Sequence, residues 1–394
     1  MAHARSVGCV VERIDGAYRA GHRLVVVVSA ADGETQRLID ETVRFTTQPD
    51  PAAVDLLLAT GEQASVARLV LALAHQGVPA EPFTGARAGV LTDSVHGKAR
   101  VCHCDTRQIE RVLAAGRIAV VAGFQGVDTD GRVTTLGRGG SDTTAVALAA
   151  ALRADECRIY TDVDGVYTAD PRIEPRARRL DYIHCEEMLE LAGLGSKVLA
   201  TESVDYAAEH RVPLRVLSTF SPGAGTAIRH QPEVLSPPVV GVAASAAEAE
   251  LAAIGLPARP GLVAELIAPL AEARIAVDAV LQNEVRQGRS DVSFTMARRN
   301  LVMARRILSR EAGRLGAERL IEDAGIAKVS LIGRGLRSNT VILSRALAAL
   351  ERVGVSVRVV VANETRLSVL VPEVELEQAV RVWHAEFELG EPSA

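Results

Sequence analysis

The sequence is poor in aromatic residues and has no cysteine pattern typical of a small domain that is cross-linked by disulfides. Only 3% of its 394 residues are aromatic, with a single tryptophan, so its cores must be built from Val, Leu, Ile and Ala. Five cysteines, an odd number without framework spacing, favour reduced thiols. Cys102-His103-Cys104 is too closely spaced for a structural zinc site, and no second pair follows at ligand spacing. The composition therefore excludes a disulfide scaffold and argues against a zinc domain.

Long apolar runs and a strong charge of one sign are missing as well. No unbroken apolar stretch approaches the ~20 residues that span a bilayer, and the N-terminus lacks the apolar run of a signal peptide. A net charge of −5 and a pI of about 6.0 give no reason to expect nucleic-acid binding. We expect a cytoplasmic protein of two or three domains, with no membrane and no nucleic acid among its partners.

The chain is organised around a glycine-rich stretch, residues 135–144, which reads Thr-Leu-Gly-Arg-Gly-Gly-Ser-Asp-Thr-Thr. Backbone N–H groups in such a turn can form an anion-binding nest, and the start of the next helix adds partial positive charge. Ser141 and Asp142 are good caps for that helix, and Arg138 adds a planar cation suited to carboxylate or phosphate. The glycine spacing fits neither a Walker loop nor the dinucleotide fingerprint. Two interpretations stay open: an anion cradle, or a loop that only turns a strand into a helix.

Two features lead the chain into this stretch. The apolar run at residues 118–122 predicts a strand buried inside the sheet. A hairpin is expected next, with its turn at Asp130-Gly131 and its return strand at residues 133–136.

Further polar candidates lie earlier in the chain. The β-branched run at residues 24–28 predicts another buried parallel strand. Ligands gather past the carboxyl ends of such strands, so Ser29 and Thr35 are site candidates, although both residue types also serve as helix caps. Glu62 precedes a predicted helix at residues 64–75, where it is either a site residue or a first-turn acid favoured by the helix dipole.

A second polar loop follows the predicted strand at residues 157–160. It offers hydroxyls, carboxylates, a tyrosine and an arginine, the groups that a nucleotide site needs. Its acids also suit turns, and Asp170-Pro171 in particular suits turn initiation. Lys197 is a further cation that could reach a phosphate or could simply be a surface lysine. The candidates in the loop are Thr161, Asp162, Tyr167, Asp170 and Arg172.

The C-terminal part contains a repeat. Proline and glycine concentrate in residues 221–238, which predicts a domain boundary. Two copies of a β-α-β-β-α-β pattern follow, at residues 248–322 and 323–394, each the split βαβ arrangement. We expect a first domain at residues 1–228 and a linker at residues 229–247. An interface between the two small sheets would be a natural small-ligand site.

Taken in order, these motifs resemble the aspartokinases of the amino-acid kinase superfamily. The resemblance implies an α/β fold: a three-layer αβα sandwich with a mainly parallel sheet, followed by two ferredoxin-like ACT domains. The motifs that carry it are Val28-Ser29-Ala30, Thr60-Gly61-Glu62-Gln63, Gly123-Phe124-Gln125-Gly126, Thr134 to Asp142, Tyr160 to Tyr167, and Asp170-Pro171-Arg172.

The resemblance implies transfer of the γ-phosphoryl group of ATP, with Mg²⁺, to the β-carboxylate of L-aspartate. A carboxylate is already a nucleophile, so catalysis would be positioning and charge neutralisation. The implied nucleotide-binding residues are Thr161, Asp162, Tyr167, Asp170, Arg172 and Lys197. The implied aspartate-binding residues are Ser29, Thr35, Glu62, Arg138 and Ser141. The implied catalytic residues are Arg138, Ser141, Asp142 and Lys197.

The sequence departs from the family at its start. The family begins with a Lys-Phe/Tyr-Gly-Gly-Thr-Ser loop, whereas residues 1–8 read Met-Ala-His-Ala-Arg-Ser-Val-Gly, with no lysine before Lys98. Losing one preorganised charge contact to a transition state costs about 3 kcal/mol, so this departure implies impaired or altered activity. The alternatives are a non-catalytic homologue acting as a regulatory or ligand-binding subunit, and an enzyme repurposed for another amino acid.

The predicted effector region departs too. Pro257-Ala258-Arg259-Pro260-Gly261 stands where the family has an acid at the second position, so feedback by lysine or threonine is not implied. Asp278, Gln282 and Asn283 remain near the expected amino-acid effector pocket. The ACT pair is expected to support a homo-oligomer, either with effector binding or as a dimerisation surface alone.

Overall fold

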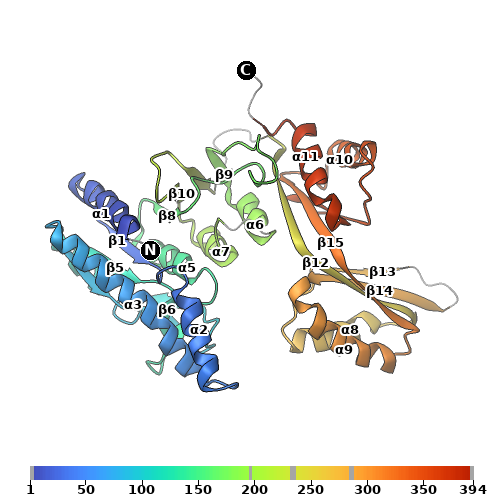
Figure 1. The fold of residues 1–394 in the computed structure, drawn as a ribbon, viewed down its shortest axis with the longest axis horizontal. Helices are drawn as coiled ribbons and strands as arrows, with labels where there is room; N and C mark the ends of the chain where they lie inside the picture. The colour runs from blue at the N-terminus through green and yellow to red at the C-terminus, as the bar shows by residue number, and fades with distance from the viewer. Residues whose placement is uncertain (1–3, 195–197, 231–236, 284–287, 391–394) are drawn as a thin grey trace. The chain divides into compact units, whose positions relative to one another are not determined.

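The computed structural model describes residues 4–194, 198–230, 237–283 and 288–390 (Figure 1). The chain forms two compact units. The first combines Met1–Val166 with Arg179–Ser236, and the second combines Tyr167–Arg178 with Pro237–Ala394.

The first unit is built around a parallel sheet whose central strand is buried on both faces. Strand β5 (Ile118–Ala122) lies between β1 (Val25–Val28) and β2 (Ala80–Phe83), and both pairings are parallel. One face of β5 packs against α1 and α3, and the other packs against α4 and α5. These layers confirm the predicted αβα sandwich. The helices are α1 (Ala4–Arg19), α2 (Glu34–Phe45), α3 (Pro51–His75), α4 (Arg107–Ala114) and α5 (Gly140–Leu152).

The remaining strands of this unit form two four-stranded mixed sheets, so its parallel strands do not share a single sheet. The order β8-β10-β11-β9 contains one antiparallel pair, β10 with β11. The order β4-β3-β6-β7 ends in the predicted hairpin, in which Gly131 has a φ of 77°. The elements are β3 (Val90–Thr92), β4 (Val101–Cys104), β6 (Gln125–Val127), β7 (Val133–Thr135), β8 (Cys157–Thr161), β9 (Tyr182–His184), α6 (Cys185–Gly193), α7 (Thr201–His210), β10 (Leu214–Ser218) and β11 (Thr226–Arg229).

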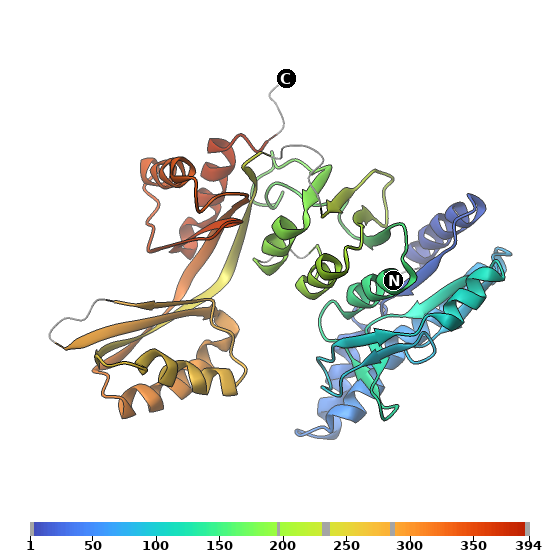
Figure 2. The same cartoon turned by 180° about the vertical axis from the view of Figure 1, so that it is seen from behind.

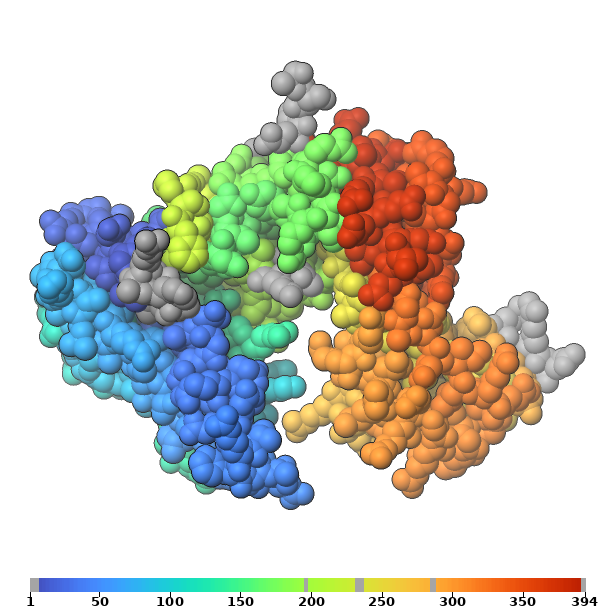
Figure 3. All heavy atoms as spheres, viewed as in Figure 1, coloured from blue at the N-terminus to red at the C-terminus, as the bar shows by residue number. Residues whose placement is uncertain are grey.

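The second unit contains a six-stranded antiparallel sheet, and two long strands run through both halves of this sheet (Figures 1 and 2). Its order is β13-β14-β12-β15-β17-β16, and each half carries its own helices and its own apolar core. The two halves pack side by side in the space-filling view, the first orange and the second red (Figure 3). The elements are β12 (Val239–Pro257), α8 (Leu262–Glu272), β13 (Ala279–Gln282), β14 (Arg289–Ala297), η1 (Arg298–Asn300), α9 (Leu301–Arg314), β15 (Arg319–Gly333), α10 (Thr340–Arg352), β16 (Val359–Ala362), β17 (Arg366–Pro372), η2 (Glu373–Glu375) and α11 (Leu376–Glu386).

The start of β12 differs from the prediction. Residues 239–247 were expected to be linker, but Val239–Ser245 pairs with the C-terminal half of β15. This pairing supplies the fourth strand of the second ferredoxin-like copy, whose first three strands are β15, β16 and β17. The fourth strand of the second copy therefore precedes the first copy in the chain instead of following α11.

Helix α3 also differs, because it begins at Pro51, whereas the sequence predicted a helix that begins at residue 64. A Cβ at Gly61 would lie 3.0 Å from the Cβ of Ala30, so this glycine allows close packing rather than ending the helix. Helix α3 is long and apolar enough in composition to cross a membrane. Its Leu69 and Leu73 are fully buried in the core of the first unit, so part of that apolar composition packs inside the protein.

Candidate functional site

The glycine-rich stretch forms a tight turn between β7 and α5. Gly137 and Gly139 have φ values of 79° and 70°, in the left-handed region that favours glycine. Helix α5 begins at Gly140 with Gly139 as its N-cap and no side-chain cap, so the prediction that Ser141 and Asp142 cap the helix was wrong. These two side chains lie in the first turn instead.

Close backbone packing brings this turn to the end of β5. A Cβ at Gly123 would lie 2.8 Å from the Oγ atom of Ser141, so only glycine lets the two segments approach. Phe124 follows in the left-handed region with a φ of 66°, and its N–H donates to the Oγ1 atom of Thr144 at 3.1 Å. The carboxyl end of the central strand therefore meets the N-terminus of α5, as expected for a ligand site in an open α/β sheet.

Glu62 reaches the same edge of the sheet from α3. Its side chain is 3% exposed, and its Oε1 atom accepts a hydrogen bond from Ala30 N at 3.1 Å. The Oε2 atom is buried and has no hydrogen-bond partner among the described residues. Burial raises the pKa of Glu62 to about 7. A half-satisfied buried carboxylate is costly, and a bound cation or ammonium group would satisfy it.

The other predicted aspartate-binding residues lie in the turn after β1. Ser29 is exposed directly past the strand, and Thr35 is partly buried in the first turn of α2. A Cβ at Gly61 would lie 3.0 Å from the Cβ of Ala30 and 3.6 Å from the Cγ atom of Glu34, so α3 packs directly on this turn. The N–H of Gly123 donates to Val28 O at 3.0 Å and joins the turn to the end of β5. Ser29, Glu62 and Ser141 thus come from segments that meet at one sheet edge.

The charged residues of the glycine turn differ in environment. Arg138 is exposed and forms no ion pair with any other residue that the structure describes. Burial raises the pKa of Asp142 to about 6, although the N–H of Ala200 at the start of α7 donates to it and opposes this rise. Asp142 therefore connects α5 to α7, while Arg138 is available to an anion.

Sequence reasoning missed one buried acid beside this site. Asp55 of α3 is 1% exposed, and its carboxylate accepts hydrogen bonds from Thr135 Oγ1 at 2.6 Å and Thr135 N at 3.1 Å. The N–H of Gly97 donates at 3.1 Å, and His96 Nδ1 lies 2.7 Å away. No local pattern distinguishes Asp55 from a surface acid, because its partners lie about 40 and 80 residues later in the chain.

The predicted nucleotide residues divide between the two units. Thr161 ends β8, and its Oγ1 donates to Oδ1 of the exposed Asp162 at 3.1 Å. Tyr167, Asp170 and Arg172 belong to the second unit. Lys197 lies outside the described residues.

Asp170 and Arg172 form a bidentate ion pair within that second segment. The Nη2 and Nε atoms of Arg172 lie 2.6 Å and 3.0 Å from the carboxylate oxygens of Asp170. Asp170 also accepts from the Arg172 N–H at 2.9 Å, which is the turn geometry that the sequence left open as an alternative. The segment is anchored on the sheet of the second unit, where Val242 N donates to Thr168 O at 2.7 Å. The Nε2 atom of His384 lies 3.0 Å from Thr168 Oγ1.

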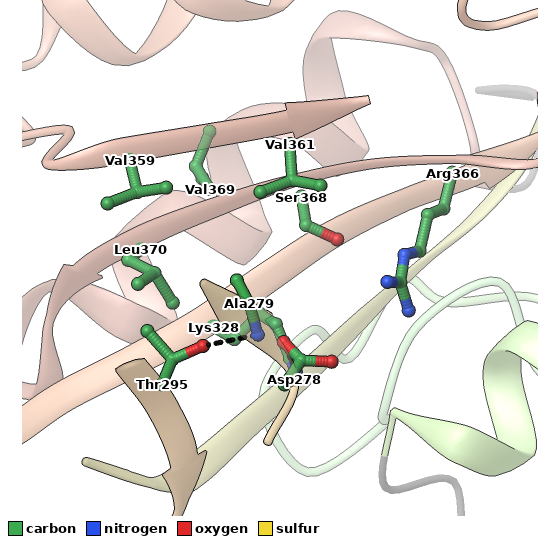
Figure 4. A pocket seen from close by; sticks show the side chains of 10 residues that line it. All are labelled: Asp278, Ala279, Thr295, Lys328, Val359, Val361, Arg366, Ser368, Val369 and Leu370. Carbon is green, nitrogen blue, oxygen red and sulfur yellow. Dashed lines mark hydrogen bonds and ion pairs between the residues drawn. The ribbon is translucent and has the colours of Figure 1, made fainter. Parts of the chain in front are cut away.

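The predicted effector residues lie along β13 and just beside it. Asp278 lines a pocket on the sheet face opposite the helices, where Lys328 Nζ lies 2.9 Å from Asp278 and 3.6 Å from Glu248. Figure 4 shows Asp278, Ala279 and Thr295 on one side of this pocket and Val359 and Val361 on the other. Gln282 donates instead to Ser290 Oγ at 3.3 Å, and the Asn283 N–H donates to Asp291 O. Neither Gln282 nor Asn283 lines the pocket that contains Asp278.

Comparisons with known proteins agree with this architecture. Residues 3–218 match the amino acid kinase family, and residues 329–387 match an ACT domain. An aspartokinase of Pseudomonas aeruginosa is 47% identical over 387 residues, which cover 98% of this chain and 94% of that protein. The crystal structure of E. coli aspartokinase III with aspartate and ADP has a TM-score of 0.78 at 26% identity, covering 96% of each chain. Its complex with lysine and aspartate has a TM-score of 0.75 at 27% identity, again covering 96% of each chain.

Proposed function

Since this chain belongs to the aspartokinases of the amino acid kinase family, we propose that it transfers the γ-phosphoryl group of ATP to the β-carboxylate of L-aspartate. The observation that carries the proposal is the buried Oε2 atom of Glu62, which has no partner among the described residues and lies at the sheet edge that holds the glycine turn. A substrate with an ammonium group beside a carboxylate would fill this place. The related E. coli structure in complex with aspartate and ADP supports this choice of substrate and nucleotide.

In the proposed complex, Glu62 pairs with the ammonium group of aspartate and the Arg138 guanidinium pairs with its α-carboxylate. Ser29, Thr35 and Ser141 supply hydroxyl contacts from the same sheet edge. The N-terminus of α5 and the turn before it add partial positive charge where the phosphoryl group would transfer. Catalysis then consists of holding the β-carboxylate in line with the phosphate, because this carboxylate needs no base to act as a nucleophile.

We assign the nucleotide to Thr161, Asp162, Tyr167, Asp170, Arg172 and Lys197. Mg²⁺ is held in proteins by one or two carboxylates together with substrate phosphates, and the exposed carboxylate of Asp162 at the end of β8 fits that requirement. When bound, Mg²⁺ would neutralise phosphate charge. Asp170 would keep the planar Arg172 group oriented until a phosphate competes for it, because the two form a bidentate pair.

The proposal extends to location and assembly. We place the enzyme in the cytoplasm, where ATP and free aspartate are available and where its five free cysteines would stay reduced. The edge strands β13 and β16 expose Val280 and Val360 at 38% and 42%, which favours pairing with a second copy of the chain. The pocket at Asp278 and Lys328 would take an amino-acid effector. Light scattering with and without amino acids would test the pairing with a second copy and the binding of an effector.

The activity is tested with purified protein, ATP, Mg²⁺, L-aspartate and hydroxylamine, which traps the acyl phosphate as a hydroxamate. We expect aspartate-dependent hydroxamate in the wild type and its loss in Arg138→Met. Arg132→Met is the matched control, because Arg132 is exposed on the hairpin before the turn and pairs with Asp130.

Two outcomes would contradict the proposal. ATP binding without turnover would indicate a non-catalytic regulatory homologue. Turnover only with other acids would indicate a repurposed enzyme. The relatives at 46–47% identity are named as aspartokinases or aspartate kinases, and they give no support to these alternatives.

A further inference from the structure

The buried carboxylate of Asp55 is placed to control the glycine turn. Thr135 is the last residue of β7 and stands three positions before Arg138. Both its N–H and its hydroxyl donate to Asp55, at 3.1 Å and 2.6 Å. Strand β7 is therefore fixed to α3 at the point where the chain enters the turn.

Asp55 also holds a second segment that abuts the turn. The Gly97 N–H donates to both carboxylate oxygens at 3.1 Å, and His96 Nδ1 lies 2.7 Å from Oδ2. A Cβ at Gly137 would lie 3.2 Å from Gly97 O, so residues 96–98 pack directly against the turn. The N–H of Ala99 donates to Thr135 O at 2.9 Å and closes this arrangement.

The position of Asp55 on its helix links this arrangement to Glu62. The two acids are seven residues apart on α3, which places them on the same face and about 10 Å apart along the axis. Glu62 reaches the turn after β1, and Asp55 reaches the turn that carries Arg138. The same helix therefore carries Glu62, the proposed partner of the substrate's ammonium group, and through Asp55 holds the turn that carries Arg138, the proposed partner of its α-carboxylate.

We infer that Asp55 is a positioning residue that fixes the separation between Glu62 and Arg138, and thereby the affinity for the α-ammonium and α-carboxylate groups of the substrate. This inference rests on the proposed function. A buried carboxylate is tolerated only when its hydrogen bonds are satisfied, and here the donors come from the two segments that shape the turn. Replacing this carboxylate with an amide should loosen the turn without changing any group that contacts substrate.

The test compares Asp55→Asn with Asp128→Asn. Asp128 is a matched control because it is 2% exposed and accepts from the N–H groups of Asp130 and Arg132 at the far end of the same hairpin. We expect Asp55→Asn to raise the KM for aspartate at least tenfold and to change the KM for ATP less than twofold. Asp128→Asn should leave both KM values within twofold of wild type.

Either of two results would overturn the inference: an unchanged KM for aspartate in Asp55→Asn, or an equal rise in the control. If Asp55→Asn does not fold, Thr135→Val provides the test, because it removes only the hydroxyl donor. It should raise the KM for aspartate about threefold, and no rise would also overturn the inference. A wild type that forms no acyl phosphate from aspartate refutes the proposed function and this inference together. An active wild type with an unaffected Asp55→Asn variant refutes this inference alone.

Discussion

The state of Glu62 gives the sharpest prediction, because its protonation should control aspartate binding near neutral pH. Its pKa stands at about 7 instead of the ordinary 4.5, owing to burial. That difference corresponds to about 3 kcal/mol against the ionised form in the empty site. Pairing with an ammonium group requires the ionised form, so below pH 7 Glu62 must lose its proton when aspartate binds. The apparent affinity for aspartate should therefore fall about tenfold for each pH unit below about 7.

The Glu62→Gln variant isolates this effect. The change keeps the side-chain shape and removes the charge, and hydrogen bonds to charged groups contribute about 1.5–3 kcal/mol. We expect the KM for aspartate at pH 8 to rise roughly tenfold to a hundredfold, with little change in the KM for ATP. The assay measures ADP release between pH 5.5 and 8.5 at varied aspartate. Wild-type kcat/KM for aspartate should rise with pH and level off near pH 7, and the variant should lose this break.

Asp142 supplies an internal reference, because its pKa of about 6 should leave a lower break in both proteins. Glu110→Gln is a control, since Glu110 is an exposed acid of α4 that bonds to Thr106. A flat wild-type profile between pH 6 and 8, or an unchanged break in Glu62→Gln, would refute the reasoning.

The raised pKa of Glu62 also predicts that the stability of the protein falls as pH rises, whereas its affinity for aspartate rises. The raised folded-state pKa means that the contribution of Glu62 to stability is fully present below the unfolded value of 4.5 and is lost as pH rises through about 7. Without substrate at pH 8, Glu62→Gln should unfold at a higher temperature than the wild type. A lower unfolding temperature would contradict a costly buried charge.

Three further predictions concern the turn and the ACT unit. Gly139→Ala should reduce both stability and activity, because the new Cβ would overlap Ala200 and force a φ of 70° on alanine; thermal unfolding and turnover measure this, and a variant like the wild type would refute it. Burial lowers the pKa of His384, which lies beside Thr168, so wild-type stability should be fully present above the ordinary value of 6.5 and fall as pH drops towards the lowered value. Urea titrations at pH 7.5 and 5.5 should show this loss, and a smaller loss in His384→Asn. Lys328→Met should destabilise the chain by about 3 kcal/mol in urea titrations by leaving two carboxylates unpaired, and a neutral effect would contradict this.

Local patterns predicted two strands of the parallel sheet and the turn of the hairpin. The apolar runs at residues 24–28 and 118–122 correspond to β1 and β5, because strands covered on both faces need no polar alternation. The hairpin turn at Asp130-Gly131 is confirmed, since glycine at positive φ is a local requirement.

Long-range contacts account for the wrong predictions of the linker and of the start of α3, and for the buried acid that the sequence did not reveal. Val239–Ser245 resembled linker because its partner strand lies about 90 residues later, and no local pattern reports that pairing. The helix was predicted to begin only at residue 64, because the neighbouring Ala30 that requires a small residue at Gly61 belongs to another segment. Asp55 was overlooked for the same reason, since its donors come from distant loops. The predicted roles of the site residues in binding aspartate and the nucleotide remain predictions.

A crystal structure of the chain with L-aspartate and ADP tests the central claim most directly. The account predicts the ammonium group of aspartate within hydrogen-bond distance of Glu62 Oε2 and a carboxylate on the Arg138 guanidinium, at the edge where β1 and β5 end. Aspartate bound elsewhere, or Glu62 turned away from a ligand in this place, would contradict it.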